Sequence, residues 1–316
     1  KQTAVMTKKF QLKDLFDSYA QFCKAVPGAD TSADLDSLQG AAVTARKRIV
    51  SMVGNAVFND IVGLGEDADF FKDMLRSAVA NLTLANQLIF DAVNRRKGGV
   101  DLYKYEMEGM RRSYMENFYN AMDSLISELA AEPYVMSSSP ELRPVLEDWR
   151  KTNYCKLLAK CKVDSADEFD EIYPIDLSYL FFFRCVPLQK EVLDEGMSGY
   201  FSRLEEGGED PTFLETAEKV LPLLKRALVK KTVAKALRRF DILEFPATIR
   251  NLFEDNNTSR QGSEEASRAL NLATQLEGEV EDLLHNVDML LDAQQGSDYL
   301  SYSADNRPDD SMYLMP

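Results

Sequence analysis

Hydrophobic residues recur every three or four positions along most of this chain, a spacing that places them on one face of an α-helix. In the first half, this pattern predicts helices over residues 10–26, 32–62, 67–96, 107–131 and 141–152. In the second half, it predicts helices over residues 177–204, 211–240 and 263–293. Glycine, proline and polar loops separate these segments, as is typical of helix ends. The sequence therefore predicts a mainly α protein.

Some local features interrupt or refine this pattern. Residues 100–105 and 242–252 are predicted to be short extended segments. Pro187 is expected to split helix 177–204, and Pro222 to kink or break helix 211–240, because proline lacks the N–H that the helix ladder needs. The last helix carries an apolar seam that should pack on another helix of this chain or of a neighbour. The seam consists of Ala273, Leu276, Val280, Leu283, Val287 and Leu290.

Several residues of the first half recur at an offset of 143 residues, which predicts a duplicated unit. The matched pairs are Phe58 with Phe201, Phe70 with Phe213, and Arg95-Arg96 with Arg238-Arg239. We predict two tandem related modules, each with long antiparallel helices and a short extended segment. The predicted parts are an N-terminal helix or arm (1–31), module 1 (32–132), a linker with a short helix (133–174), module 2 (175–295) and a flexible or docking C-terminal tail (296–316).

Composition narrows the class of protein. Of the 316 residues, 45% are hydrophobic, which is enough to form cores and excludes global disorder. The formal net charge of −15 argues against a general nucleic-acid binder, whose surface would be basic. No apolar run approaches the roughly 18 residues of a membrane helix, so no membrane partner is expected. Residues 1–10 lack the apolar core of a secretory signal.

Residue types that carry chemistry are scarce. The single histidine, His285, is expected on the outer face of the last helix, which removes Ser-His-Asp, Cys-His and multi-histidine metal sites as economical hypotheses. The four cysteines do not have the spacing of a disulfide framework or a zinc site: Cys23, Cys155, Cys161 and Cys185. No glycine-rich phosphate loop follows a strand. We therefore predict no enzymatic activity, no cofactor, and no catalytic or metal-binding residues.

A basic segment stands out against the acidic background. Residues 225–239 contain no acid and carry Lys225, Arg226, Lys230, Lys231, Lys235, Arg238 and Arg239. On a helix these charges do not share one face, whereas a DNA-reading helix would segregate them. Three interpretations stay open: a solvated helix surface, pairing with a neighbouring subunit or partner, and nucleic-acid contact.

The residues from Gly296 onward are rich in Asp, Ser, Asn and Pro, but they also carry aromatic and large apolar side chains. A disordered tail is one interpretation. The other is an arm that becomes ordered against a neighbouring protein, because purely solvating tails lack aromatics. On this second interpretation the candidate contact residues are Tyr299, Tyr302, Tyr313 and Leu314.

The order of long helix, helix with a basic end, short extended segment and helix resembles the helical head–tail connector (adaptor or head-completion) proteins of tailed bacteriophages. The acidic balance and the aromatic tail add to this resemblance. More narrowly, the segment from Glu168 to Leu180, followed by Pro187-Leu188-Gln189, resembles a two-module family of phages and prophages of gut bacteria. The resemblance covers about residues 33–294, and it rests on patterns of helices and apolar residues.

The resemblance implies a virion structural protein of the neck that is assembled in the host cytoplasm. Its subunits would form a homo-oligomeric ring, usually twelvefold, that docks to the portal protein and contacts tail or neck proteins. Genome DNA would pass through the ring without sequence-specific binding. An alternative is a cytosolic all-helical regulatory or nucleic-acid-associated protein that uses the basic segment 225–239.

Overall fold

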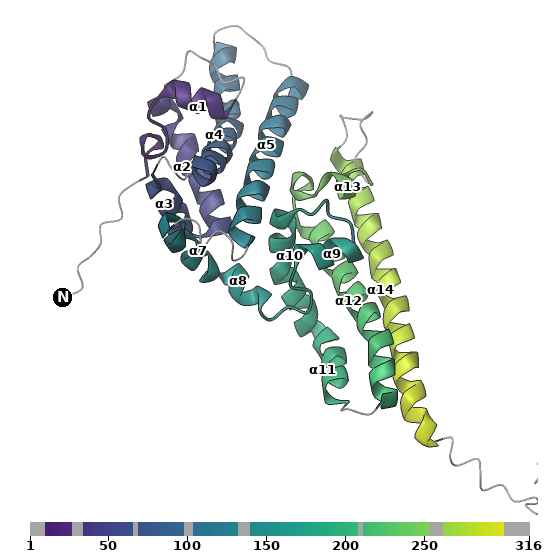
Figure 1. Cartoon of the computed structure of the whole chain (residues 1–316). Coiled ribbons are helices and arrows are strands. Elements are labelled where there is room, and N and C mark those ends of the chain that lie inside the picture. The colour runs from purple at the N-terminus through teal and green to yellow at the C-terminus, as the bar shows by residue number, and fades with distance from the viewer. Residues whose placement is uncertain are drawn as a thin grey trace, which may run out of the picture. The chain divides into compact units, whose positions relative to one another are not determined.

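The computed structural model describes residues 10–26, 34–65, 69–97, 104–131, 140–207, 211–252 and 262–299. These residues are mainly helical and include no β-strand, which confirms the predicted mainly α class (Figure 1). The chain divides into two compact units. Unit 1 comprises residues 1–187 and 239–269, and unit 2 comprises residues 188–238 and 270–316.

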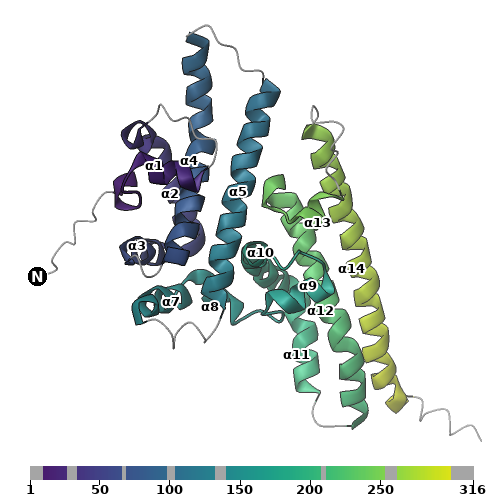
Figure 2. The same cartoon turned by 45° about the horizontal axis from the view of Figure 1, so that its top comes forward.

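The first part of unit 1 is a group of helices around α4. Its elements are η1 (Leu12–Asp14), α1 (Tyr19–Ala25), α2 (Leu35–Val53), α3 (Asn55–Gly63), α4 (Asp69–Lys97) and α5 (Lys104–Ala130). Helix α4 packs against both α2 and α5, as Figures 1 and 2 show. Small buried residues such as Ala42, Ala45 and Ala78 lie on the packed sides of α2 and α4, and they allow the two helix axes to approach closely.

The rest of unit 1 consists of short helices and the beginnings of two long ones. They are η3 (Pro140–Leu142), α7 (Arg143–Arg150), α8 (Asn153–Leu158), α9 (Ala166–Ile172), the first part of α10 (Tyr179–Val192), η5 (Ile242–Glu244), α13 (Ala247–Arg250) and the start of α14 (Gly262–Tyr299). Unit 2 holds the end of α10, a π-helical turn η4 (Leu193–Met197), α11 (Ser198–Glu206), α12 (Pro211–Arg239) and most of α14.

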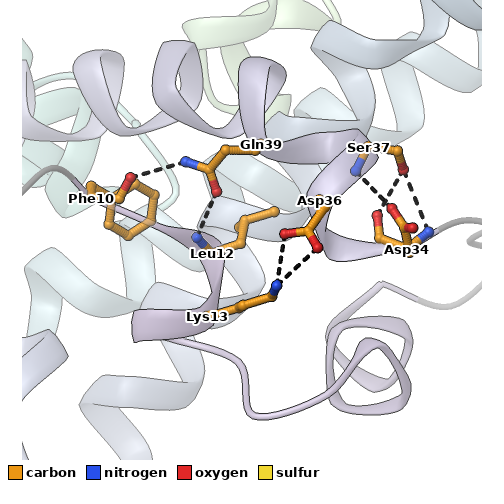
Figure 3. Close-up of polar contacts among 7 residues, drawn as sticks. All are labelled: Phe10, Leu12, Lys13, Asp34, Asp36, Ser37 and Gln39. Carbon is orange, nitrogen blue, oxygen red and sulfur yellow. Dashed lines mark hydrogen bonds and ion pairs between the residues drawn. The ribbon is translucent and has the colours of Figure 1, made fainter.

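The predicted helix over residues 10–26 is wrong as a single element, because a non-helical stretch separates η1 from α1. Ser18 ends this stretch by accepting a hydrogen bond from the Gln21 N–H, which caps α1. Gln39 of α2 binds the backbone at the start of η1. Its side-chain amide donates to the Phe10 carbonyl and accepts from the Leu12 N–H, each at 2.9 Å (Figure 3).

An ion pair and a helix cap complete this contact region. Lys13 pairs with Asp36 at the start of α2, where Asp34 and Ser37 form a reciprocal cap (Figure 3). The side chains of Leu12 and Phe16 are fully buried in unit 1. The N-terminal segment therefore forms part of the core of unit 1.

The predicted helix over residues 32–62 is also wrong as a single element. Gly54 has φ 90° and ψ 156°, a backbone conformation that is essentially reserved for glycine, and it separates α2 from α3. The apolar spacing continues through the break because both helices bury residues in the same core, among them Ile49 and Ile61. The hydrophobic period alone therefore could not locate the turn.

The breaks expected at the two prolines are not observed. Helix α10 continues through Pro187, and the chain departs from helical geometry later, at Gly196 in η4, where φ is 130°. Helix α12 runs unbroken through Pro222. Pro222 is exposed, so water can satisfy the carbonyl group that loses its N–H donor.

The extended segment predicted for residues 242–252 is wrong, because η5 and α13 occupy it. Of the predicted segment 100–105, residues 104 and 105 begin α5, and residues 100–103 lie outside the described residues. The predicted tail start at residue 296 falls inside α14, which continues to Tyr299.

The duplication stays a prediction. Helices α4 and α12 are each 29 residues long, and the paired residues Phe58 and Phe201 are both buried. Phe70, in contrast, is 57% exposed, whereas Phe213 is half-buried and lies over Gly207. The compact units also divide at residues other than the predicted module boundaries.

Candidate functional site

The basic segment lies on α12 of unit 2, where three of its cations pair with carboxylates of the same unit. Lys230 Nζ lies 2.5 Å from Glu279 of α14. Lys235 Nζ lies 2.8 Å from Glu191 and 2.7 Å from Glu195.

Arg238 makes the third of these pairings. Its Nε and one terminal nitrogen donate to the two oxygens of Glu277, at 3.0 Å and 2.6 Å. Such a two-point contact fixes the orientation of the guanidinium relative to the carboxylate, in addition to pairing their charges. The cations therefore link α12 to α14 and to the end of α10 with its π-helical turn.

The charges of these pairs stabilise each other. Burial alone would lower the pKa of Lys235, but its hydrogen bonds to Glu191 and Glu195 outweigh burial, and the pKa is raised. The hydrogen bond to Glu277 likewise raises the pKa of Arg238. On the acidic side, the hydrogen bond from Lys230 lowers the pKa of Glu279. These shifts favour the ionised forms of Lys235, Arg238 and Glu279 at neutral pH.

The remaining predicted contact residues are spread over several environments. Lys225 and Lys231 are half-buried on α12, whereas Arg226 and Arg239 are exposed. Tyr299 is the last residue of α14, and its side chain lies outside the described part. Tyr302, Tyr313 and Leu314 also lie outside the described residues. Within the described ranges, the predicted cations of α12 therefore lie in several environments and do not form one site.

Two other predictions can be located on the structure. His285 is exposed on α14, as the helical pattern predicted. None of the four cysteines forms a disulfide bond, and burial raises the pKa of the Cys185 thiol. Of the predicted α14 seam, Ala273, Leu276, Val280 and Val287 are buried, and Leu283 and Leu290 are half-buried.

Polar side chains do converge elsewhere, around a cavity of about 280 Å³ in unit 1. One face of α5, the loop before α10 and the η5–α13 segment line it. The polar lining residues are Glu116, Tyr119, Asn120, Asp123, Asp176, Ser178, Glu244 and Arg250. None of these lining residues was among the candidate site residues predicted from the sequence.

Carboxylates hold the loop before α10 in an unusual conformation. Asp176 and Leu177 both have left-handed backbones, with φ 55° and 50°. Asp170 Oδ1 accepts hydrogen bonds from the Ile175 and Leu177 N–H groups, at 2.8 and 3.0 Å. The Asp176 carboxylate accepts from both the N–H and the hydroxyl of Thr248 in α13. These bonds offset the conformational cost of the two left-handed residues.

Asp123 of α5 caps the helix that follows this loop. Its Oδ1 accepts from the Ser178 hydroxyl and from the Leu180 N–H, both at 2.8 Å. Ser178 in turn accepts from the Phe181 N–H at 3.2 Å. Burial raises the pKa of Asp123, and these two hydrogen bonds to Asp123 oppose the rise. The first turn of α10 is therefore tied to α5 by a residue 57 positions earlier in the chain.

Glu244 is the centre of a charged network on the wall of the same cavity. Its carboxylate accepts from Arg184 Nε at 3.1 Å and lies 3.6 Å from Arg48. Arg48 also donates to the Tyr119 hydroxyl at 2.5 Å. Burial and the charge of Glu244 raise the pKa of Tyr119, so this phenol stays protonated. The Arg184 guanidinium lies 4.9 Å from the centre of the Phe240 ring.

A carboxylate pair joins α3 to α7 outside the cavity. Asp60 lies on α3 and Asp148 on α7, and Lys151 Nζ binds Asp148 at 2.7 Å. Asp60 Oδ2 is buried with no hydrogen-bond donor. Burial and the neighbouring Asp148 charge raise the pKa of Asp60 above its ordinary value of 3.8. The folded state therefore holds this proton more tightly than the unfolded chain does.

Asp60→Asn is expected to stabilise the protein by about 1 kcal/mol at pH 7, because the amide can donate to Asp148 and carries no charge. In the wild type, stability should fall as pH rises from 3.8 through the raised pKa of Asp60. The variant should lose this dependence, which urea unfolding at a series of pH values measures. Asp36→Asn, at an exposed ion pair, should change stability by less than about 0.5 kcal/mol. Equal effects of the two substitutions would contradict the prediction.

A second cavity in unit 1 is mostly apolar. Its volume is about 340 Å³, and Trp149, Phe182 and Phe183 contribute aromatic walls. No group of three or more His, Cys, Asp or Glu side chains in the described ranges is arranged to hold a metal ion. None of the helices among these residues combines the length and hydrophobicity that crossing a bilayer requires.

No protein-family model, curated protein or solved structure matches this chain.

Proposed function

We propose that this protein is a structural subunit of a bacteriophage neck, a head–tail connector that works by docking to copies of itself and to the portal protein. The observation that carries the proposal is the role of the carboxylates in the segment 168–180. Its carboxylates hold backbone: Asp170 supports the left-handed turn, and Asp176 fixes α13. The segment on which the family resemblance rests therefore stabilises the fold, and this favours a structural role for the protein.

The cavity in unit 1 supports the same proposal. Catalytic carboxylates need free lone pairs and access to substrate. Here Asp176 is engaged by Thr248, Glu244 by two arginines, and Glu116 by Arg250 at 2.8 Å. Their hydrogen bonds join α5, α10 and α13 within unit 1. We infer that this polar cluster fixes the fold that presents the docking surfaces.

The nucleic-acid alternative loses support from the internal pairing of the basic segment. Lys230, Lys235 and Arg238 are held by carboxylates of unit 2. Contact with phosphates would have to displace these partners, which weakens the electrostatic gain on which nucleic-acid binding depends. We therefore assign the basic segment to the stability of unit 2.

The tail supplies a direct test of the docking role. A chain that ends at Tyr299 should keep the unfolding transition of the full chain, because the described core lies before residue 300. It should bind the portal protein encoded in the same genome at least about tenfold more weakly, since a tethered arm adds avidity. Surface plasmon resonance with immobilised portal measures this. Equal affinity of the two chains would contradict the docking-arm assignment.

A further inference from the structure

The second cavity of unit 1, of about 340 Å³, is lined by the end of α5, by α7, α8 and α10, and by the start of α9. Its inner wall is apolar. The buried side chains of this wall are Leu129, Trp149, Ala166, Phe182 and Phe183, each 5% exposed or less. Sites for small molecules are mostly apolar cavities that begin at roughly 300 Å³. We call this space the aromatic cavity.

The aromatic walls of the cavity support one another. The ring centres of Trp149 and Phe183 lie 5.1 Å apart, and those of Phe183 and Phe182 lie 5.8 Å apart. Phe182 also makes an edge-on contact with the fully buried Phe169, at 5.8 Å. Rotation of any one of these rings would break its contact with the next. The cavity therefore presents a preformed apolar surface.

Charged side chains surround the mouth of the aromatic cavity. Asp164, Asp167 and Arg150 line it and are exposed, so they mark the side that water reaches. Within the described ranges, neither carboxylate forms an ion pair or a side-chain hydrogen bond. Two carboxylates against one guanidinium give the mouth a net negative charge. This charge attracts cations and repels anions.

Tyr179 adds a neutral polar group to the lining. Burial, and then the charge of Asp167, raise the pKa of its phenol. The hydroxyl therefore stays protonated at neutral pH. It can accept a hydrogen bond from an ammonium group, because a phenol is both a donor and an acceptor.

The walls and the mouth together select one class of ligand. Apolar walls favour an aromatic or alkyl body, whereas the carboxylates at the mouth favour a positive charge at one end of the ligand. We propose that the aromatic cavity binds a small organic cation of the arylalkylamine class, with its ring inside the cavity and its ammonium group toward Asp164 and Asp167. The inference does not depend on the connector role, because the site lies in unit 1 of a single chain.

The single tryptophan of the chain makes this binding measurable, because Trp149 is part of the cavity wall. The probes are phenethylamine and hydrocinnamate, which share a phenylethyl body and carry an ammonium and a carboxylate, respectively. Each is titrated into the full chain while Trp149 fluorescence is recorded, with free N-acetyltryptophanamide as the correction for direct quenching. Phenethylamine should bind saturably with a Kd of about 1 mM or lower, and hydrocinnamate at least about tenfold more weakly.

A matched pair of substitutions on α9 tests the role of the mouth. Asp167→Asn should weaken phenethylamine binding about threefold and should not weaken hydrocinnamate binding. Glu171→Gln removes the same charge from an exposed position of α9 outside the cavity lining, and it should leave both affinities unchanged.

A third variant tests the interior of the cavity. Ala130→Phe, at the end of α5, should fill part of the space and weaken both probes. Circular dichroism checks that the variant is folded. If it does not fold, the comparison of Asp167→Asn with Glu171→Gln still decides the question, because both positions are exposed.

The proposal would be overturned if phenethylamine gave no saturable change up to about 10 mM, or if the two probes bound equally well. Equal weakening by Asp167→Asn and Glu171→Gln would also overturn it, because the amine would then respond to the overall negative charge of the chain. None of these measurements involves the portal protein, so their failure is distinct from failure of the connector proposal.

Discussion

Glu244→Ala is expected to lower the free energy of unfolding by about 3 kcal/mol, the low end of the range for a buried ion pair that loses one partner. The Glu244 side chain is 11% exposed and holds Arg184 and Arg48. Its removal leaves two guanidinium groups without their carboxylate, although Arg48 keeps its hydrogen bond to Tyr119 and Arg184 keeps one to Tyr154. Both arginines keep some contact with water, which limits the loss. Urea unfolding followed by circular dichroism measures the change.

The matched control is a glutamate in an exposed pair. Glu215 binds Lys219 at 2.7 Å on α12, but both side chains are largely exposed. Glu215→Ala should therefore change the free energy of unfolding by less than about 0.5 kcal/mol. If the two substitutions cost the same, the Glu244 network would not have the structural role given to it here.

Phe58→Ala is expected to cost about 3–5 kcal/mol, the usual range for removing a buried aromatic ring. Phe58 of α3 is fully buried and makes an edge-on contact with Phe10, whose ring centre lies 5.5 Å away. Arg46 also lies over the Phe58 ring, at 5.2 Å from its centre. The substitution leaves a cavity and removes the partner of both groups. Thermal unfolding would detect it as a clear fall in Tm.

Phe70→Ala is the control for this experiment. Phe70 lies in the first turn of α4 and is 57% exposed, so its loss should cost less than about 1 kcal/mol. Because both substitutions remove one phenyl ring, a difference between their effects reports the burial of the ring and not the loss of an aromatic side chain as such. A large effect at Phe70, or none at Phe58, would contradict the burial described for unit 1.

The sequence predicted the long helices best. The expected helix over 67–96 corresponds to α4 (Asp69–Lys97). The expected seam of α14 is buried at Ala273, Leu276, Val280 and Val287. These segments repeat an apolar residue every turn over many turns. The helical period is therefore recognisable even where single positions depart from it. Breaks were harder to predict. Gly54 separates two helices that share a core, and neither interior proline interrupts its helix.

The candidate site was predicted poorly because its contacts join distant parts of the chain. Asp123 caps a helix that begins more than fifty residues later, and Asp176 binds Thr248 in a segment expected to be extended. No local pattern encodes such pairs. The scatter of the basic segment around α12 has the same cause. Its carboxylate partners come from α10, η4 and α14, so the cations point in several directions.

The most direct test of the connector proposal is mass photometry of the purified chain, alone and mixed with the portal protein of the same genome. The account predicts a new species in the mixture, whose mass equals the portal ring plus many copies of this 35.7 kDa chain. Electron microscopy of that species should place a second ring coaxially beneath the portal. A chain that stays monomeric at every ratio, with the portal mass unchanged, would contradict the account.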